Sequence, residues 1–313
     1  MKSFVYLSKM RLLYLSMIAF VLIATTALSL ANENVKIIPK NIFTRETSKL
    51  PVLSESVGFP ILSAQGVLAY DIDSGVTLYE KNPEKPLLPA STTKIMTALI
   101  ALDAYPLDKV LIVGSGTLVD GQKMGLVAGS EITVENLLYG LMVYSANDAA
   151  LTLAQNYEGG EESFIEAMNK KAVELGLKNT HFANPVGLDG DSQRSTARDM
   201  VLLSSVAMKN PEFAKIVGTK KIVVQSIDGK YIFPLTNINE LLGKVDGVMG
   251  VKTGWTEGAR ENLISYIDRD GKRIMVAVLG SQDRFGETKE LIDWIYKNYT
   301  WKRIGFNLRN TEE

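Results

Sequence analysis

The chain has 313 residues, of which 46% are hydrophobic and 22% charged, and its formal net charge is −1. This near-neutral balance provides no basic surface, so we expect no binding to nucleic acid. Cysteine is absent, which excludes disulfides, thiolate catalysis and cysteine-ligated metal sites. The single histidine, His181, means that a Ser-His-Asp triad must use that residue or not exist. We therefore expect no metal site, and a hydrolytic nucleophile that depends on a different base.

The N-terminus has the pattern of an export signal. Basic residues at the start of the chain precede an uncharged run over residues 12–31, which is long enough to span a bilayer. Ser29 and Ala31 are small side chains that suit the −3 and −1 positions of a cleavage site. Residues 1–31 are therefore predicted to be a signal peptide or an N-terminal membrane anchor. Both alternatives place the rest of the chain outside the cytoplasm, in the cell envelope or periplasm.

Residues 32–60 are polar and aperiodic and contain three prolines, so they are predicted to form a linker. The first regular pattern is an alternation over residues 66–80, interrupted by Asp73-Ser74-Gly75, which predicts a β-hairpin. Helical patterns follow in chain order: from Ser91, from Thr133 to a break at 144–148, beyond that break, over 161–175, over 196–209 and over 287–301.

Strand patterns return at residues 221–234, 247–255 and 262–280, and the first and third of these turn at an Asp-Gly pair. Strands therefore lie at both ends of the domain and helices between them. This order predicts an α+β fold, with a mainly antiparallel sheet flanked by helices and an inserted helical subdomain. The folded domain is expected over residues 61–305, followed by a polar C-terminal tail over 306–313.

The segment P-A-S-T-T-K begins a predicted apolar helix with a serine and carries a lysine one turn later. A spacing of three places Ser91 and Lys94 on one helical face, and a serine at a helix start lies near unpaired N–H groups. A lysine whose pKa is lowered by burial or by another cation can act as a base. Taken alone, such a quartet is common, and an N-capping serine with a surface lysine explains it better.

Two further motifs change that interpretation. The segment Y-S-A-N-D places Ser145 and Asn147 in a break between two apolar helices, which is costly unless it serves a function. The segment V-K-T-G-W places Lys252, Thr253 and Gly254 on a strand, where an interior glycine often marks the close approach of another backbone or a ligand. The alternatives are an ordinary turn between helices and an exposed edge strand.

In the order S-x-x-K, S-x-N and K-T-G, these motifs and their flanking sequences resemble the D-alanyl-D-alanine carboxypeptidase family of low-molecular-mass penicillin-binding proteins. The resemblance covers residues 62–305. It implies the β-lactamase/transpeptidase-like fold and a serine peptidase that removes the terminal D-alanine from peptidoglycan stem pentapeptides. It also implies that β-lactam antibiotics are covalent inhibitors and that no cofactor is needed.

The resemblance implies a catalytic role for three residues. Ser91 attacks the carbonyl carbon between two D-alanines and forms an acyl-enzyme. Lys94 takes the serine proton, and is kept neutral by burial and by the positive charge of Lys252. Ser145 relays a proton toward the leaving amine.

The same resemblance implies the substrate-binding residues. Asn147 bonds the peptide group of the substrate, and Lys252 and Thr253 hold its terminal carboxylate. Gly254 lets the substrate lie against the strand. The backbone N–H groups of Trp255 and of the nucleophilic serine form the oxyanion hole.

After K-T-G-W-T-E-G-A the family usually continues with glycine, whereas this chain has Arg260 and Glu261. These residues are expected to form a salt-bridged or exposed loop, or Arg260 reaches the substrate. Three alternative functions stay open: a DD-endopeptidase that cuts cross-links, a β-lactamase, and a non-catalytic penicillin-sensing module. The β-lactamase is disfavoured because its usual E-x-x-L-N segment is not evident, and the sensing module because it has no need of a nucleophile.

Overall fold

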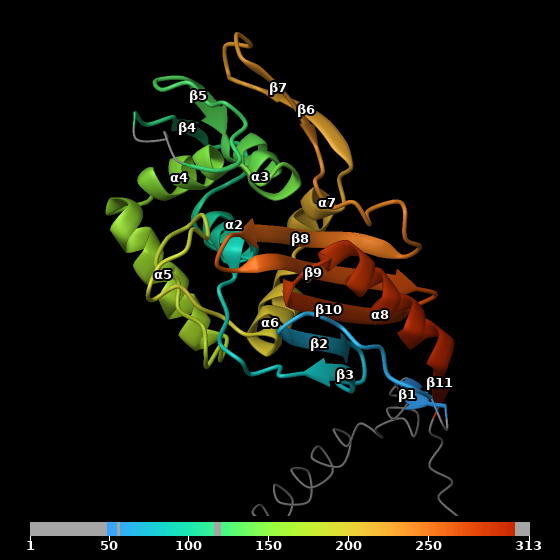
Figure 1. Cartoon of the computed structure of the whole chain (residues 1–313). Coiled ribbons are helices and arrows are strands. Elements are labelled where there is room, and N and C mark those ends of the chain that lie inside the picture. Colours follow the sequence, from blue (N-terminus) through green and yellow to red (C-terminus); the bar gives the residue numbers. More distant parts are fainter. Residues whose placement is uncertain (1–48, 55–56, 116–119, 304–313) are drawn as a thin grey trace, which may run out of the picture. The chain divides into compact units, whose positions relative to one another are not determined.

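The computed structural model describes residues 49–54, 57–115 and 120–303, so the predicted signal or anchor over 1–31 and the tail over 306–313 lie outside the described residues. The described residues belong to one compact unit. Its centre is a five-stranded antiparallel sheet with the strand order β3-β2-β10-β9-β8 (Figure 1). The strands are β2 (Gly66–Asp71), β3 (Thr77–Lys81), β8 (Val248–Thr256), β9 (Arg260–Arg269) and β10 (Lys272–Ser281).

A helical block is inserted between β3 and β8. It consists of the 3-10 turn η1 (Ala90–Thr93), α2 (Lys94–Ala104), α3 (Val134–Val143), α4 (Asn147–Gln155), α5 (Gly160–Glu174), α6 (Ala197–Ala207) and α7 (Pro211–Val217). Two small ribbons extend from this block, β4 (Val110–Ile112) with β5 (Glu131–Thr133), and β6 (Lys221–Gln225) with β7 (Ile232–Thr236). The predicted α+β fold is therefore confirmed.

The alternation of side chains along the strands divides the core in two. Leu68 of β2 and Met275 of β10 face the helical block, whereas Val67 and Val276, one residue away on each strand, face α8 (Arg284–Asn298). Figure 1 shows α6 and α8 on opposite faces of the sheet. The edge strand β8 borders the helical block, and the functional motifs meet there because Ser91 begins that block.

The structure agrees with the predicted start of one helix in the helical block and differs from the predicted start of another. Thr133 caps α3, since its hydroxyl accepts a hydrogen bond from the backbone nitrogen of Asn136 at 3.2 Å. The helix expected to open at Ser91 instead starts as the 3-10 turn η1, and the α-helix begins at Lys94. The serine therefore lies in a tight turn rather than in the first turn of a regular helix.

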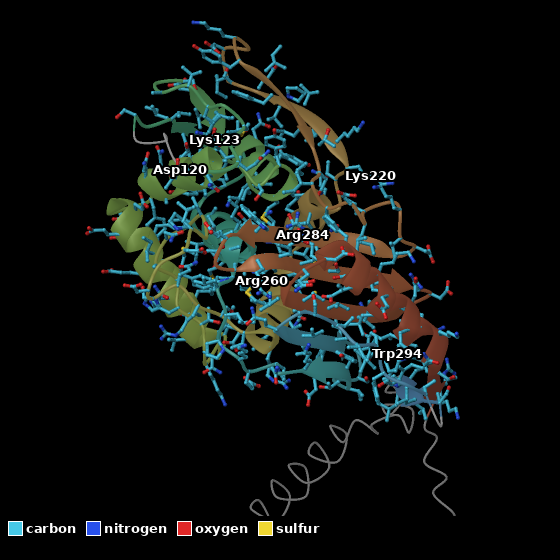
Figure 2. All side chains as sticks on the ribbon, in the orientation of Figure 1. Asp120, Lys123, Lys220, Arg260, Arg284 and Trp294 are labelled. Atoms are coloured by element: carbon cyan, nitrogen blue, oxygen red, sulfur yellow. The ribbon has the colours of Figure 1, made fainter. Side chains whose placement is uncertain are left out.

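The secondary structure at both ends of the domain differs from the prediction. The helix expected over 287–301 ends at Asn298, and β11 (Tyr299–Arg303) pairs antiparallel with β1 (Lys49–Leu53). Residues 49–53 of the predicted linker are thus a strand of the folded unit. Further contact comes from Trp294 of α8, whose Nε1 donates to the carbonyl oxygen of Gly58 at 2.7 Å (Figure 2). Within the described ranges, no helix has the length and apolar character to cross a membrane.

Candidate active site

Ser91 lies in the turn η1, directly before α2. Ala90 in this turn has a positive φ of 48°, a conformation that is unfavourable for a residue other than glycine. Two glycines allow the surrounding backbone to approach the turn. A side chain at Gly187 would overlap the carbonyl oxygen of Ala90, and a Cβ at Gly254 would lie 3.1 Å from the backbone nitrogen of Ser91. The turn is therefore held between strand β8 and the loop that contains Gly187.

Lys94 is the first residue of α2 and is fully buried. Its Nζ lies 2.9 Å from Ser91 Oγ, 2.6 Å from Asn147 Oδ1 and 2.6 Å from the carbonyl oxygen of Val186. The last two oxygens can only accept hydrogen bonds. A neutral amine that donates both hydrogens to them has its lone pair free for the hydroxyl proton of Ser91. This is the arrangement that a base for a serine nucleophile requires.

Burial lowers the pKa of Lys94 to about 7, because an ammonium group is poorly solvated inside the protein. The nearby carboxylate of Asp148 raises this pKa and so acts in the opposite direction. Lys252 is also buried, and its pKa is lowered by burial first and then by the charges of Lys94 and Arg284. Burial is thus the main cause at Lys94, and the repulsion expected between the two lysines acts on Lys252.

Asn147 is held at both ends of its amide. Its Oδ1 accepts from Lys94, and its Nδ2 donates to the carbonyl oxygen of Asp120 at 2.5 Å. Its backbone nitrogen donates to the carbonyl oxygen of Gln122 at 2.7 Å. The next residue, Asp148, fastens the same loop, because its carboxylate accepts three successive backbone N–H groups at 2.9–3.1 Å. The loop over residues 120–126, Asn147 and Lys94 are therefore joined by hydrogen bonds. Asp120 of this loop is labelled in Figure 2.

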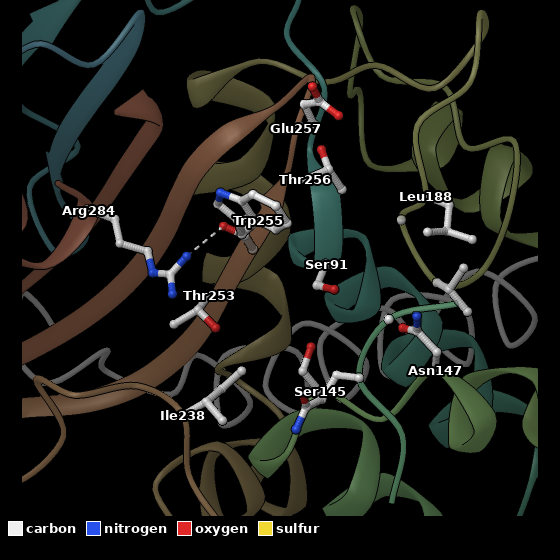
Figure 3. Close-up of a pocket in the computed structure, with 15 residues that line it drawn as sticks. Ser91, Ser145, Asn147, Leu188, Ile238, Thr253, Trp255, Thr256, Glu257 and Arg284 are labelled. Carbon is white, nitrogen blue, oxygen red and sulfur yellow. Dashed lines mark hydrogen bonds between the residues drawn. The ribbon is translucent and has the colours of Figure 1, made fainter. Parts of the chain in front are cut away.

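Ser145 lies between α3 and α4, at the predicted break. Its φ is 64°, and its side chain is buried at the pocket that also contains Ser91 (Figure 3). A residue other than glycine keeps this conformation only where the surrounding structure enforces it, which is common at functional sites. The three hydrogen-bond contacts of Lys94 Nζ go to other groups, and none of the hydrogen bonds between described residues uses the Ser145 hydroxyl. That hydroxyl is thus available to a substrate.

The K-T-G residues lie on β8, at the edge of the sheet. Thr253 and Gly254 line the pocket, whereas Lys252 is not among the lining residues and donates from Nζ to the carbonyl oxygen of Thr253 at 3.0 Å. Trp255 lines the pocket mouth and is 62% exposed. Because β8 has a strand neighbour on one side only, its outer edge can pair with an extended peptide.

The pocket in front of Ser91 has a volume of about 560 Å³ and contains a cation that no sequence motif indicated, Arg284 (Figure 3). Its Nη1 donates to the carbonyl oxygen of Gly254 at 3.2 Å. Its Nε is buried and, among the described residues, has no hydrogen-bond partner. Figure 3 shows the guanidinium of Arg284 beside Thr253, and both residues line the pocket, an arrangement that suits a carboxylate group. In the sequence Arg284 precedes the helix predicted over 287–301, and no local motif singles it out.

The two residues that depart from the family pattern have separate places. Glu261 accepts a hydrogen bond from the backbone nitrogen of Arg284 at 2.9 Å, and its other oxygen lies 4.0 Å from Arg284 Nη1. Arg260 is exposed and does not line the pocket (Figure 2). Glu261 thus orients Arg284, the arginine that lines the pocket. His181 also lies outside the pocket lining, with its Nδ1 3.1 Å from the carbonyl oxygen of Ser192.

The profile of the D-alanyl-D-alanine carboxypeptidase family, Peptidase S11, matches residues 54–283. The chain belongs to this family. The family predicted from the three motifs is therefore confirmed.

The part of the chain that the structure describes contains no group of three or more side chains suited to hold a metal ion.

Several members of the D-alanyl-D-alanine carboxypeptidase family are similar to this chain. D-alanyl-D-alanine carboxypeptidase DacF of Bacillus subtilis is 35% identical over 245 residues, 75% of this chain and 63% of its own length. DacB2 of Mycobacterium tuberculosis is 35% identical over 76% of this chain and 84% of its own length. A D-alanyl-D-alanine endopeptidase of Pseudomonas aeruginosa is 33% identical. The chain thus spans less than two thirds of the DacF length.

Among solved structures, the Streptomyces K15 DD-transpeptidase is similar to this chain with a TM-score of 0.73 and 33% identity. The similarity covers 77% of this chain and all of that structure. The five-stranded sheet and helical block therefore form the fold of penicillin-recognising enzymes, as the motifs predicted.

Proposed function

We propose that the chain is a serine-type D-Ala-D-Ala carboxypeptidase that removes the terminal D-alanine from peptidoglycan stem pentapeptides and is acylated by β-lactams. The observation that carries this proposal is the 2.9 Å contact between Lys94 Nζ and Ser91 Oγ in a pocket that also contains Arg284. The names of the relatives DacF and DacB2 support the same reaction.

In the acylation step, Ser91 Oγ attacks the carbonyl carbon of the penultimate D-alanine while its proton passes to the neutral amine of Lys94. The backbone N–H groups of Ser91 and Trp255 donate to the oxyanion that forms. When the C–N bond breaks, the leaving amine takes the proton from Lys94 through the hydroxyl of Ser145. D-alanine departs, and the rest of the stem remains as an ester of Ser91.

The terminal carboxylate is placed by Thr253 and Arg284, which face the same part of the pocket. Lys252 acts through Thr253, since its ammonium bonds the Thr253 carbonyl rather than lining the pocket. Asn147 was expected to bond the substrate, but both ends of its amide are engaged by protein groups. We therefore assign to Asn147 the positioning of Lys94. Gly254 allows the contact between β8 and the nucleophile turn.

Hydrolysis of the ester completes the reaction. A water molecule attacks the ester carbonyl, and Lys94 takes its proton and returns it to Ser91 Oγ. The DD-endopeptidase reaction follows the same steps with a cross-linked stem as leaving group, and the relative from Pseudomonas aeruginosa carries that name. The two activities are separated by the product, which is free D-alanine in one case and two separated muropeptides in the other.

Intact mass after incubation with penicillin tests the proposal. We expect one adduct of the mass of penicillin on the peptide that contains Ser91, no adduct in Ser91→Ala, and an unchanged adduct in the control Ser192→Ala, which alters an exposed loop serine. D-alanine release from a D-Ala-D-Ala pentapeptide must disappear with the adduct. An adduct that persists in Ser91→Ala contradicts the assignment, and rapid hydrolysis of penicillin without D-alanine release indicates a β-lactamase.

We propose that the catalytic domain lies outside the cytoplasm, because the proposed substrate is a peptidoglycan stem peptide and the N-terminus has the pattern of an export signal. We further propose that residues 12–31, which lie outside the described part of the chain, hold the domain at the membrane where pentapeptide precursors are present. N-terminal sequencing of the native protein tests this. A soluble protein that starts at Asn32 contradicts the anchor, whereas an intact Met1 in the membrane fraction supports it.

A further inference from the structure

We propose that Asn262 is a positioning residue for acylation, because its side-chain amide holds the turn of Ser91 at the distance from β8 that the oxyanion hole requires. Asn262 lies on β9, is fully buried and is not among the residues that line the pocket. The inference rests on the acylation step proposed above and adds a residue that acts behind the pocket, without touching the substrate.

Both ends of the Asn262 amide are used, and each end bonds a different segment of the chain. Its Nδ2 donates to the carbonyl oxygen of Leu88 at 2.9 Å, and its Oδ1 accepts from the backbone nitrogen of Gly280 at 2.7 Å. Gly280 belongs to β10, which borders β9 on the side away from β8 (Figure 1). The amide therefore joins the centre of the sheet to the segment that leads into the nucleophile turn.

Leu88 comes three residues before Ser91 in the chain. Among the described residues, its carbonyl oxygen accepts no hydrogen bond other than the one from Asn262. The preceding residue, Leu87, exchanges two backbone hydrogen bonds with Ser195, at 2.8 and 2.9 Å. The segment is thus held by the residues before α6 on one side and by Asn262 on the side of the sheet.

The register of the sheet places Asn262 directly opposite Gly254 of β8. Residues paired in this way point their side chains to the same face of the sheet. At Gly254 the missing side chain leaves room for the turn, because a Cβ there would lie 3.1 Å from the backbone nitrogen of Ser91. The glycine therefore permits the close approach of the turn, and the neighbouring asparagine stabilises it with a hydrogen bond.

The oxyanion hole depends on this approach, because its two donors lie on different segments. The backbone nitrogen of Ser91 belongs to η1, and that of Trp255 belongs to β8. Both donors must lie about 2.7–3.1 Å from the oxygen that becomes negative, so the two segments must keep a fixed separation. Without the Asn262 amide, the Leu88 carbonyl loses its partner, and it is better satisfied when it turns toward water. The separation then increases, and the transition state is stabilised less.

Asn262→Leu tests the inference, because leucine has about the same size but no polar atom. In single-turnover acylation by a chromogenic β-lactam, we expect the limiting rate constant to fall by about tenfold to a hundredfold. The β-lactam concentration that gives half of this rate should change by less than about twofold, since the carboxylate-binding residues are untouched.

The matched control is Asn298→Leu. Asn298 is also buried, its amide donates to the carbonyl oxygen of Trp294 at 2.8 Å, and it does not line the pocket. This variant should lose stability in thermal unfolding but keep the limiting rate constant. A loss of the same size in both variants would show that the effect is general destabilisation, and it would overturn the inference.

A boronic acid provides a readout that a merely structural role would not change. It forms a tetrahedral adduct with a serine hydroxyl and so imitates the transition state, and its affinity should fall in Asn262→Leu by about the same factor as the rate constant. If this variant does not fold, Asn262→Ser, in which a water molecule can bridge Leu88 and Gly280, should show the same pattern with a smaller loss.

Two results overturn the inference while the unmodified protein is still acylated. One is an unchanged rate constant and boronic acid affinity in a folded Asn262 variant. The other is a loss confined to the half-saturating concentration of the β-lactam. Absence of acylation in the unmodified protein instead contradicts the proposed function, and the inference with it.

Discussion

The backbone nitrogen of Ser91 lies 3.1 Å from the position that a side chain on Gly254 would take. The carbonyl oxygen of Pro89 and the Cβ of Ala90 lie at the same distance. The glycine of K-T-G therefore permits direct contact between strand β8 and the turn of the nucleophile. A contact of 3.1 Å is tighter than ordinary packing, so any side chain at this position must displace one of the two segments.

Gly254→Ala should therefore lower the rate of acylation more than it lowers stability. A shift of a few tenths of an ångström at Ser91 misaligns its hydroxyl with the substrate carbonyl, and we expect a loss of about tenfold to a hundredfold in the acylation rate. Stopped-flow acylation by a chromogenic β-lactam measures it. Gly190→Ala is the control, because a side chain there meets no atom within 4 Å. Equal rates in the two variants would contradict this role of Gly254.

Acylation should depend on the neutral form of Lys94. Burial lowers its pKa to about 7, so the neutral fraction, and with it the rate, rises as pH increases through 7 and falls about tenfold per unit below it. Single-turnover acylation between pH 5 and 9 shows this limb. Lys94→Arg, which stays protonated throughout, should remain inactive over the whole range. A rate that is independent of pH would exclude Lys94 as the base.

Asp148→Asn should shift that limb in a specific direction. The Asp148 carboxylate raises the pKa of Lys94, so its removal should lower this pKa and move the acidic limb of acylation to lower pH. The variant should also be less stable by about 1–3 kcal/mol, because an amide cannot accept all three backbone N–H groups of the loop. Calorimetry and the pH profile measure the two effects. A limb that moves to higher pH falsifies the electrostatic argument.

Recognition of the free carboxylate should depend on Arg284. The unmodified protein is expected to prefer a peptide ending in D-Ala-D-Ala over the matching C-terminal amide by about tenfold to a hundredfold in kcat/KM, as charge-assisted hydrogen bonds allow. Arg284→Ala should remove most of this preference by raising KM. Arg260→Ala is the matched control, since Arg260 does not line the pocket. If Arg260→Ala loses the preference and Arg284→Ala keeps it, Arg260 and not Arg284 binds the terminal carboxylate.

Local sequence patterns were sufficient to predict the strands of the sheet and the contact between Ser91 and Lys94. The hairpin that turns at Asp270-Gly271 was visible because a period-2 alternation and a turn signal need only neighbouring residues, and both turn residues have a positive φ in the structure. In the same way the break before Asn147 interrupts a local helical pattern. Ser91 and Lys94 are three residues apart, so their contact at 2.9 Å was also within reach of local reasoning.

Only the tertiary structure placed Arg284 in the pocket, paired β1 with β11, and linked both ends of the Asn147 amide to protein groups. These relationships join segments far apart in the chain, and no local period encodes them. The pKa of Lys94 has the same origin. The sequence by itself predicted which side chain acts as the base, but the pKa of that side chain depends on how completely distant parts of the chain exclude water from it.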